Sequence, residues 1–332
     1  MITKISPKKQ SWQKQLADGI SDPKALLQCL ALDPQLAGLR AHEQFKTRVP
    51  HCFVARMQPG NINDPLLRQV LPVDKELDPM PGFSHDPLAE AQANPSPGLL
   101  HKYHGRVLLT LTSHCAINCR FCFRRHFPYA ENHAQGKHWA AILSYIQKDS
   151  SIKEVIFSGG DPLLVSDQQL NKLCMQIAEI SHIKTLRIHT RLPIVLPDRI
   201  TPALIKLLAE LPLRCVLVIH CNHSNEIDQH VIQAMRALQS AHITLLNQSV
   251  LLKGVNDNAD ALIHLSETLF DCGVLPYYLH LLDKVQGAAH FDIEEAQAKK
   301  LHQQMQAALP GYLVPKMVRE AAQALSKLIV PS

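Results

Sequence analysis

Short apolar runs of β-like composition recur along the C-terminal two-thirds of the chain. The six runs cover residues 107–112, 154–158, 185–190, 215–220, 243–250 and 274–280. Stretches with helical spacing of apolar positions lie between and after them, at residues 137–148, 167–180, 202–211, 226–239, 259–272 and 293–308. After a longer first interval, the runs begin roughly thirty residues apart, the length of one βα unit. The pattern predicts an α/β protein with a partial parallel (β/α)6 barrel rather than a closed eight-stranded one.

The first hundred residues follow a different pattern. Residues 11–16 and 22–32 have helical spacing, and Ser21 or Asp22 with Pro23 is typical of an N-cap and a first-turn proline for the second stretch. Residues 58–105 contain eight prolines and are expected to be irregular structure wrapped on the barrel. We therefore expect a mainly helical, proline-rich scaffold, then the barrel core, then a C-terminal segment, at residues 1–100, 101–285 and 286–332.

Polar or small residues stand at the C-terminal end of each predicted strand. In chain order they are Cys115, Gly159, Arg191, His220, Gln248 and Asp283. Parallel βα units carry their chemistry at the C-terminal ends of the strands, and these ends meet on one face. We therefore expect a single site on that face.

Three cysteines follow the first apolar run as a CxxxCxxC motif: Cys115, Cys119 and Cys122. Thiolates are the usual ligands of iron–sulfur clusters, and three of them hold three irons of a 4Fe–4S cluster. The fourth iron is then open to a small molecule. The alternative is a zinc site completed by His114 or His126. Structural zinc normally has four protein ligands, and the sequence contains no second CxxC pair.

Composition limits the class of protein further. The net charge of +5 is mildly basic and no Lys/Arg-rich block occurs, so no nucleic-acid partner is expected. Hydrophobic residues make up 46% and charged residues 19%, which is typical of a chain with a full core. Because no apolar run reaches eighteen residues and the start is not of signal-peptide type, we expect no membrane span and a cytoplasmic location. Nine cysteines, an odd number, argue against a complete disulfide framework.

The CxxxCxxC motif after a first strand resembles the signature of radical S-adenosylmethionine (SAM) enzymes. The wider stretch at residues 103–125 resembles lysine 2,3-aminomutases, and the likeness extends over roughly residues 100–327. Within that family the chain is most similar to the enzyme that makes β-lysine for elongation factor P. The resemblance implies a barrel of radical SAM type with three cofactors: a 4Fe–4S cluster, SAM and pyridoxal 5′-phosphate (PLP).

The implied reaction is an isomerisation of L-α-lysine to (R)-β-lysine by a radical 1,2-amino shift. The implied partners are L-lysine and, through function, elongation factor P with its lysyl-transferring synthetase. Two alternatives remain: an enzyme of free β-lysine metabolism, and a non-catalytic iron–sulfur or zinc protein.

The resemblance also assigns residues to SAM. Gly159, Gly160 and Asp161 resemble the site for the methionine amine of SAM. The two glycines allow close backbone approach to a ligand, and exposed carbonyls with an aspartate suit an ammonium group. His220 and Gln248 are the expected contacts of the ribose or carboxylate of SAM.

The family's PLP-carrying lysine lies twelve residues after a Val-Pro pair. Here that pair is at residues 314–315 and Lys327 follows at the same spacing, with Lys316 as the rival. The approach at residues 321–325 lacks the glycines usual in the family. We therefore expect residues 317–328 to be more helical than in the family.

Cations and a hydroxyl group are expected around the PLP phosphate. Tyr103 and Arg106, just before and at the start of the first barrel strand, match the family's phosphate positions. Lys102 lies beside them in the sequence. This predicts that the PLP phosphate lies at the first barrel strand.

Substrate contacts follow from charge. A guanidinium suits an α-carboxylate, and Arg124 matches the family's residue, with Arg125 as the alternative. Asp283 and Glu320 match the acidic pair for the ε-ammonium, and two acids disfavour a glutamate substrate. Free-lysine enzymes of the family generally have Asp at the second position, so Glu320 and the short tail after Lys327 favour the elongation factor P branch. In a helical tail, Glu320 and Lys327 would lie two turns apart on one face.

Overall fold

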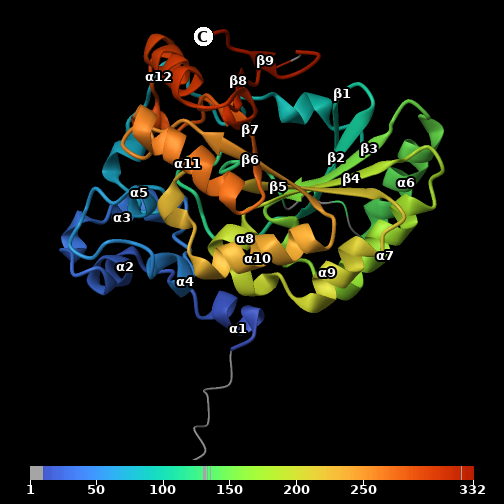
Figure 1. Ribbon diagram of the computed structural model, residues 1–332, viewed down its shortest axis with the longest axis horizontal. Helices are drawn as coiled ribbons and strands as arrows, with labels where there is room; N and C mark the ends of the chain where they lie inside the picture. The colour runs from blue at the N-terminus through green and yellow to red at the C-terminus, as the bar shows by residue number, and fades with distance from the viewer. Residues whose placement is uncertain (1–9, 130–131, 133, 135, 323) are drawn as a thin grey trace, which may run out of the picture.

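The computed structural model describes residues 10–332 except 130, 131, 133, 135 and 323. Its strands form one sheet whose order follows the chain from β1 to β9. The six predicted strands are all present, as β2 (Arg106–Thr112), β3 (Glu154–Gly159), β4 (Thr185–Thr190), β5 (Arg214–His220), β6 (Thr244–Val250) and β7 (Leu275–His280). They pair in parallel, each with the next. The predicted α/β partial barrel is confirmed (Figure 1).

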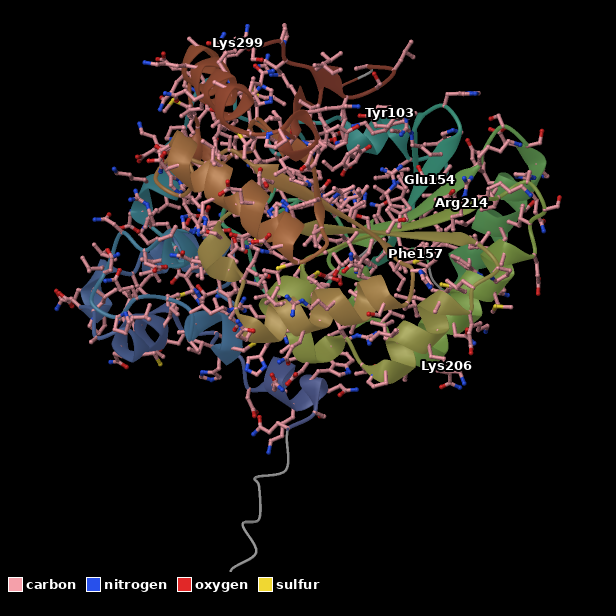
Figure 2. All side chains as sticks on the ribbon, in the orientation of Figure 1. Tyr103, Glu154, Phe157, Lys206, Arg214 and Lys299 are labelled. Atoms are coloured by element: carbon pink, nitrogen blue, oxygen red, sulfur yellow. The ribbon has the colours of Figure 1, made fainter. Side chains whose placement is uncertain are left out.

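The predicted helices follow the strands and cover the outside of the sheet (Figure 1). They are α6 (Trp139–Lys148), α7 (Asp167–Ala178), α9 (Pro202–Ala209), α10 (Gln229–Ser240), α11 (Ala259–Asp271) and α12 (Glu295–Ala308), and the single turn α8 (Leu192–Val195) precedes α9. Local sequence sets where they begin. Ser166, for example, accepts a hydrogen bond from the backbone of Gln169 and caps α7. Phe157, labelled in Figure 2, is fully buried in the middle of the sheet.

The sheet has an extra antiparallel strand at its first edge. β1 (Leu99–Tyr103) pairs with β2 through a turn in which Gly105 has a φ of +75°. This corrects the expectation of irregular structure up to residue 105. The strand forms because Leu99 and Leu100 are buried and the backbone groups of β2 need partners on this side.

The other edge also differs from the prediction. The described residues between 317 and 328, all but 323, are not helical: β8 (Lys316–Arg319) pairs in parallel with β7, and β9 (Leu328–Ile329) returns antiparallel to β8. Met317 packs into a hydrophobic cluster with α12, and Val318 lines the cavity described below. Successive side chains of a strand point to opposite faces, so Met317 and Val318 can be buried on different sides of the sheet. A helix here would leave the backbone groups at the edge of β7 without hydrogen-bond partners.

Residues 10–100 include short helices on one side of the barrel, coloured blue to teal in Figure 1. They are α1 (Trp12–Ala17), α2 (Pro23–Cys29), α3 (Leu39–Gln44), α4 (His51–Val54) and α5 (Pro65–Arg68), followed by the 3₁₀ turn η3 (Glu90–Ala93). Leu26, Phe53 and Leu66 share one hydrophobic cluster with Phe157 of the barrel. The division at residues 100 and 285 stays a prediction.

Two further findings bear on the expectations from composition. All nine cysteines are free thiols, in agreement with the absence of a disulfide framework. Among the described residues, no helix combines the length and the apolar character needed to cross a bilayer.

Candidate active site

A cavity of about 460 Å³ opens at the C-terminal ends of the barrel strands. The residues that the sequence favours for the cluster, SAM, PLP and lysine all border this cavity: Tyr103, Arg106, Cys115, Cys119, Cys122, Arg124, Gly159, Gly160, Asp161, His220, Gln248, Asp283, Glu320 and Lys327. Their placement brings segments more than two hundred residues apart to one space. Their individual roles stay predictions.

The two glycines after β3 hold the cysteine loop in place. Gly160 donates its N–H to the Thr112 carbonyl at 2.7 Å, and Asp161 donates to the His114 carbonyl at 2.8 Å. A Cβ on Gly160 would lie 2.2 Å from the His114 oxygen, and one on Gly159 would lie 2.7 Å from the Thr112 oxygen. Gly159 also has a φ of +114°. Only glycine fits at both positions, because any side chain would push the cysteine loop away.

The three cysteine side chains line the cavity together and are partly buried. Burial, then the neighbouring Cys122 and Asp161, raise the pKa of Cys115 well above its ordinary value. Burial and Cys119 raise the pKa of Cys122 to about 11. Without a metal, three thiolates in one buried space are therefore unfavourable, and the positive irons of a cluster would stabilise them. The donor set fits an iron–sulfur cluster.

The zinc alternative gains no support. Within the described part of the chain, no three His, Cys, Asp or Glu side chains are arranged to hold one metal ion. His126 Nε2 lies 3.1 Å from the Gln286 carbonyl, and its ring stacks on His85 at 4.3 Å. His114 Nδ1 lies 3.2 Å from the Ser113 hydroxyl.

Arg191, which the sequence marks only as a strand-end residue, contacts a cysteine. Its Nη1 donates to Cys119 Sγ at 2.7 Å, and its Nη2 donates to Gln69 Oε1 at 2.6 Å and Glu226 Oε2 at 2.9 Å. Burial by itself lowers the pKa of Arg191, but Cys119 and Glu226 outweigh it and raise that pKa above the ordinary value. No sequence signal joins these residues, since Gln69 belongs to the presumed scaffold.

Asp161 organises the turn that carries Arg191. One carboxylate oxygen accepts hydrogen bonds from the Leu163 N–H and the Thr190 hydroxyl, and the other from the N–H groups of Arg191 and Leu192. Burial raises the pKa of Asp161 to about 6, and these hydrogen bonds oppose the rise. Both oxygens already have protein donors, so an ammonium group here would rely mainly on backbone carbonyls.

His220 and Gln248 are register partners on β5 and β6. The His220 ring stacks on the Phe121 ring with their centres 5.6 Å apart, and its Nε2 lies 3.1 Å from the side-chain nitrogen Nδ2 of Asn222. Burial, then Arg191, lower the pKa of His220 to about 3, so the ring is neutral at physiological pH. A neutral imidazole and an amide suit hydroxyl groups better than they suit an anion.

Basic and acidic side chains meet at the C-terminal hairpin. The Lys327 ammonium forms an ion pair with Glu320, whose other oxygen lies 3.6 Å from Lys102 Nζ and 3.4 Å from the Tyr103 hydroxyl. Burial by itself raises the pKa of Glu320, but Lys327 outweighs it and the pKa falls to about 2. Glu320 is therefore an ionised carboxylate that already holds an alkylammonium group.

Asp283 follows β7 and faces the same charges. Burial and the negative charge of Glu320 raise its pKa to about 7, while Lys327 and Lys102 act in the opposite direction. Two partly buried acids of this kind repel each other unless a cation offsets their charge. The pair suits a positively charged ligand.

Arg124 borders the cavity, whereas Arg125 is held elsewhere. Arg124 donates from Nε and Nη2 to the two Glu90 oxygens at 2.8 and 2.7 Å, and from Nη1 to the Ser158 hydroxyl at 3.1 Å. Arg125 instead pairs with Glu76 at 2.7 Å. Of the two predicted candidates, Arg124 is the one that borders the cavity.

Tyr103 and Arg106 lie side by side at the start of the sheet. They are register partners, and the Arg106 guanidinium carbon lies 5.4 Å from the centre of the Tyr103 ring. Figure 2 labels Tyr103 near the C-terminal hairpin. Lys316, the rival of Lys327, also borders the cavity but is exposed, whereas the Lys327 side chain is 19% exposed.

Comparisons with known proteins agree with this arrangement. The sequence model of the Radical SAM superfamily matches residues 109–265. The crystal structure of Streptococcus suis SuiB bound to S-adenosylmethionine superposes with a TM-score of 0.50 at 15% identity, over 66% of this chain and 51% of that one. The fold is that of a radical SAM enzyme, a class that implies a 4Fe–4S cluster and SAM.

Curated proteins of similar sequence show which family of radical SAM enzymes the chain belongs to. The L-lysine 2,3-aminomutase of Escherichia coli is 51% identical, over 98% of this chain and 96% of its own. That of Haemophilus influenzae is 50% identical, over 96% and 95%. That of Clostridium subterminale is 36% identical, over 81% and 65%. The chain belongs to the L-lysine 2,3-aminomutase family.

Proposed function

We propose that this enzyme converts L-lysine to β-lysine by moving the α-amino group to the β-carbon. The observation that carries the proposal is the position of the acidic pair, Asp283 and Glu320, in the same cavity as the three cysteines. A radical site that also has a place for a distant alkylammonium group suits an amino acid with a basic side chain. The names of the relatives support lysine as that amino acid.

The cysteine side of the cavity would hold the cluster and SAM. Cys115, Cys119 and Cys122 would each bind one iron through a thiolate. The backbone at Gly159 and Gly160 would approach the methionine part of SAM, with Asp161 fixing the surrounding turns. His220 and Gln248 would contact its ribose or carboxylate. When bound, the reduced cluster and SAM supply the radical chemistry that removes a hydrogen from the substrate.

The hairpin side of the cavity would hold PLP. Lys327 would carry the cofactor covalently, and Tyr103 and Arg106 would bind its phosphate. When bound, PLP supplies the electron-delocalising group through which the nitrogen migrates. Covalent attachment of PLP would replace the Lys327 ammonium group, so Glu320 Oε1 would lose its present partner. That oxygen would then be available to the ammonium group of a substrate, while Oε2 would keep Lys102 and Tyr103.

The substrate would extend between the two sides. Arg124 would bind the α-carboxylate, and Asp283 with Glu320 would bind the ε-ammonium. The pKa of Asp283, raised to about 7 by burial and Glu320, would fall when that ammonium arrives. The chain's own residues would position the lysine and exclude water from the reacting carbons.

We further propose that the product is (R)-β-lysine and that it serves the modification of elongation factor P in the cytoplasm. Glu320, where free-lysine enzymes of the family generally have Asp, supports this branch. An enzyme of free β-lysine metabolism is the second candidate. Such an enzyme would use the same active site, but its β-lysine would not be transferred to elongation factor P.

An anaerobic assay with L-lysine, SAM, PLP and a reductant tests the main proposal. We expect β-lysine to accumulate, with chiral chromatography assigning its configuration. A Cys119→Ala variant should be inactive. If the reconstituted enzyme makes no β-lysine while other radical SAM turnover is intact, the proposal is wrong.

A second assay tests the branch. Elongation factor P and its lysyl-transferring synthetase are incubated with either α-lysine or the enzyme's product, and the intact mass of the factor is measured. We expect the product to be attached preferentially. Equal attachment of both amino acids would favour free β-lysine metabolism.

A further inference from the structure

We propose that Glu90 is a positioning residue that orients the Arg124 guanidinium for the α-carboxylate of the substrate. The inference rests on the proposed function, since it takes Arg124 as the carboxylate site. It assigns a role to a residue from the segment that sequence analysis treats as scaffold.

The hydrogen bonds of Arg124 leave room for both carboxylates. A guanidinium has five N–H groups. Glu90 receives one from Nε and one from Nη2, at 2.8 and 2.7 Å, and Ser158 receives one from Nη1 at 3.1 Å. One N–H on Nη1 and one on Nη2 remain. Two donors on different nitrogens match the two oxygens of a carboxylate, so a substrate can bind while Glu90 stays.

Aromatic rings also fix the plane of the guanidinium. Its carbon lies 4.9 Å from the centre of the Phe123 ring and 5.8 Å from that of Phe127. With Glu90 along one edge, the group has little freedom to turn. A fixed fork loses less entropy on binding a carboxylate than a mobile one.

Glu90 itself is held firmly. Its side chain is 6% exposed, and its backbone N–H donates to Asp86 Oδ1 at 3.0 Å. The η3 turn that carries it packs against β1, and the Leu88 carbonyl before it accepts from Lys102 Nζ at 3.3 Å. A substrate that displaced Glu90 would leave a buried carboxylate without its cation, which is unfavourable.

The opposite role would be that of a placeholder. Glu90 would then occupy the carboxylate position on Arg124 and compete with the substrate. The two roles predict opposite effects when Glu90 is weakened. A positioning residue makes lysine bind less tightly when it is lost, and a competitor makes lysine bind more tightly.

The test uses Glu90→Gln and Glu90→Asp in the full reconstituted enzyme, with L-lysine and L-lysinamide as substrates. Lysinamide has a neutral amide in place of the carboxylate. We expect the KM for lysine to rise about tenfold or more in Glu90→Gln, and the preference for lysine over lysinamide to shrink. Glu90→Asp keeps a negative charge beside the buried Arg124, yet its shorter side chain should shift KM in the same direction.

Glu76→Gln is the matched control. Glu76 accepts from Arg120 Nε at 2.8 Å and Nη2 at 2.6 Å, the same two-bond pairing, but neither residue borders the cavity. This variant should lower the melting temperature without changing the preference for lysine over lysinamide. If a Glu90 variant acted only by weakening the fold, Glu76→Gln would reduce the preference for lysine over lysinamide in the same way.

The outcomes are distinct. An unchanged KM and preference in both Glu90 variants overturns the inference, and a lower KM for lysine overturns it in favour of the placeholder. Equal loss of preference in Glu76→Gln also overturns it. If wild-type enzyme with an intact cluster does not convert lysine, the proposed function fails and the inference falls with it.

Discussion

The ammonium group of Lys327 forms an ion pair with the carboxylate of Glu320, seven residues earlier, across the hairpin between β8 and β9. A helical tail would also have brought these two side chains to one face, but here the loop that joins β8 to β9 brings them together. The predicted cofactor lysine thus meets the predicted substrate acid directly. Its amine lies inside the cavity rather than in solvent.

The first prediction follows from this position. Lys327→Ala should abolish the visible absorbance of enzyme-bound PLP while the iron content is unchanged, because the cysteines belong to the loop after β2 and not to the hairpin that carries Lys327. Lys206→Ala, at an exposed ion pair on α9, is the control and should bind PLP normally. Borohydride reduction with peptide mapping locates the cofactor directly. A pyridoxyl group on Lys316 would contradict the assignment.

The second prediction concerns pH. Burial and Glu320 raise the pKa of Asp283 to about 7, so this carboxylate becomes protonated as the pH falls below that value. A neutral acid attracts an ammonium group weakly. We therefore expect the KM for lysine to rise as the pH drops from 8 to about 6, by at most about tenfold per pH unit for one proton.

Asp283→Asn should remove this pH dependence and raise the KM at pH 8 as well. Loss of one partner of a buried charged contact costs on the order of 2–5 kcal/mol. Glu210→Gln serves as the control, because the Glu210 side chain is 67% exposed. A wild-type KM for lysine that stays constant over this pH range, or the same profile in Asp283→Asn, would count against the role.

The third prediction concerns the cluster potential. The buried, positively charged Arg191 guanidinium donates a hydrogen bond to Cys119 Sγ, and the carboxylate of Glu226 partly balances its charge. A positive charge favours the reduced cluster, which carries one more electron. Arg191→Gln should therefore lower the reduction potential, and Glu226→Gln should raise it. Redox titration followed by electron paramagnetic resonance, without SAM or lysine, measures both; shifts of the same sign in both variants would refute the argument.

The fourth prediction concerns the metal ligands. Replacing Cys115, Cys119 or Cys122 by Ala, one at a time, should prevent assembly of a stable 4Fe–4S cluster. Cys29→Ala, at an exposed thiol on α2, should leave iron and sulfide content unchanged. A full cluster that still responds to SAM in any of the three single variants would show that the ligand set is wrong.

The sequence by itself determined the parts of the protein that depend on local pattern. Apolar runs of the right length and spacing were enough for the strands β2 to β7 and the helices between them. The thiols of Cys115, Cys119 and Cys122 lie within eight residues, so their joint chemistry is also a local signal. The family motifs added Lys327 and Arg124, which the structure places in the same cavity.

Only the tertiary structure decided what the edges of the sheet and the partners of the buried charges would be. β8 forms because the edge of β7 needs hydrogen-bond partners, a demand that residues 316–319 do not reveal on their own. Arg124 meets Glu90 thirty-four positions away, and Arg191 meets Gln69 across 122 positions. A buried charge must find a partner wherever the folded chain supplies one, and its identity is set by packing rather than by neighbours in the sequence.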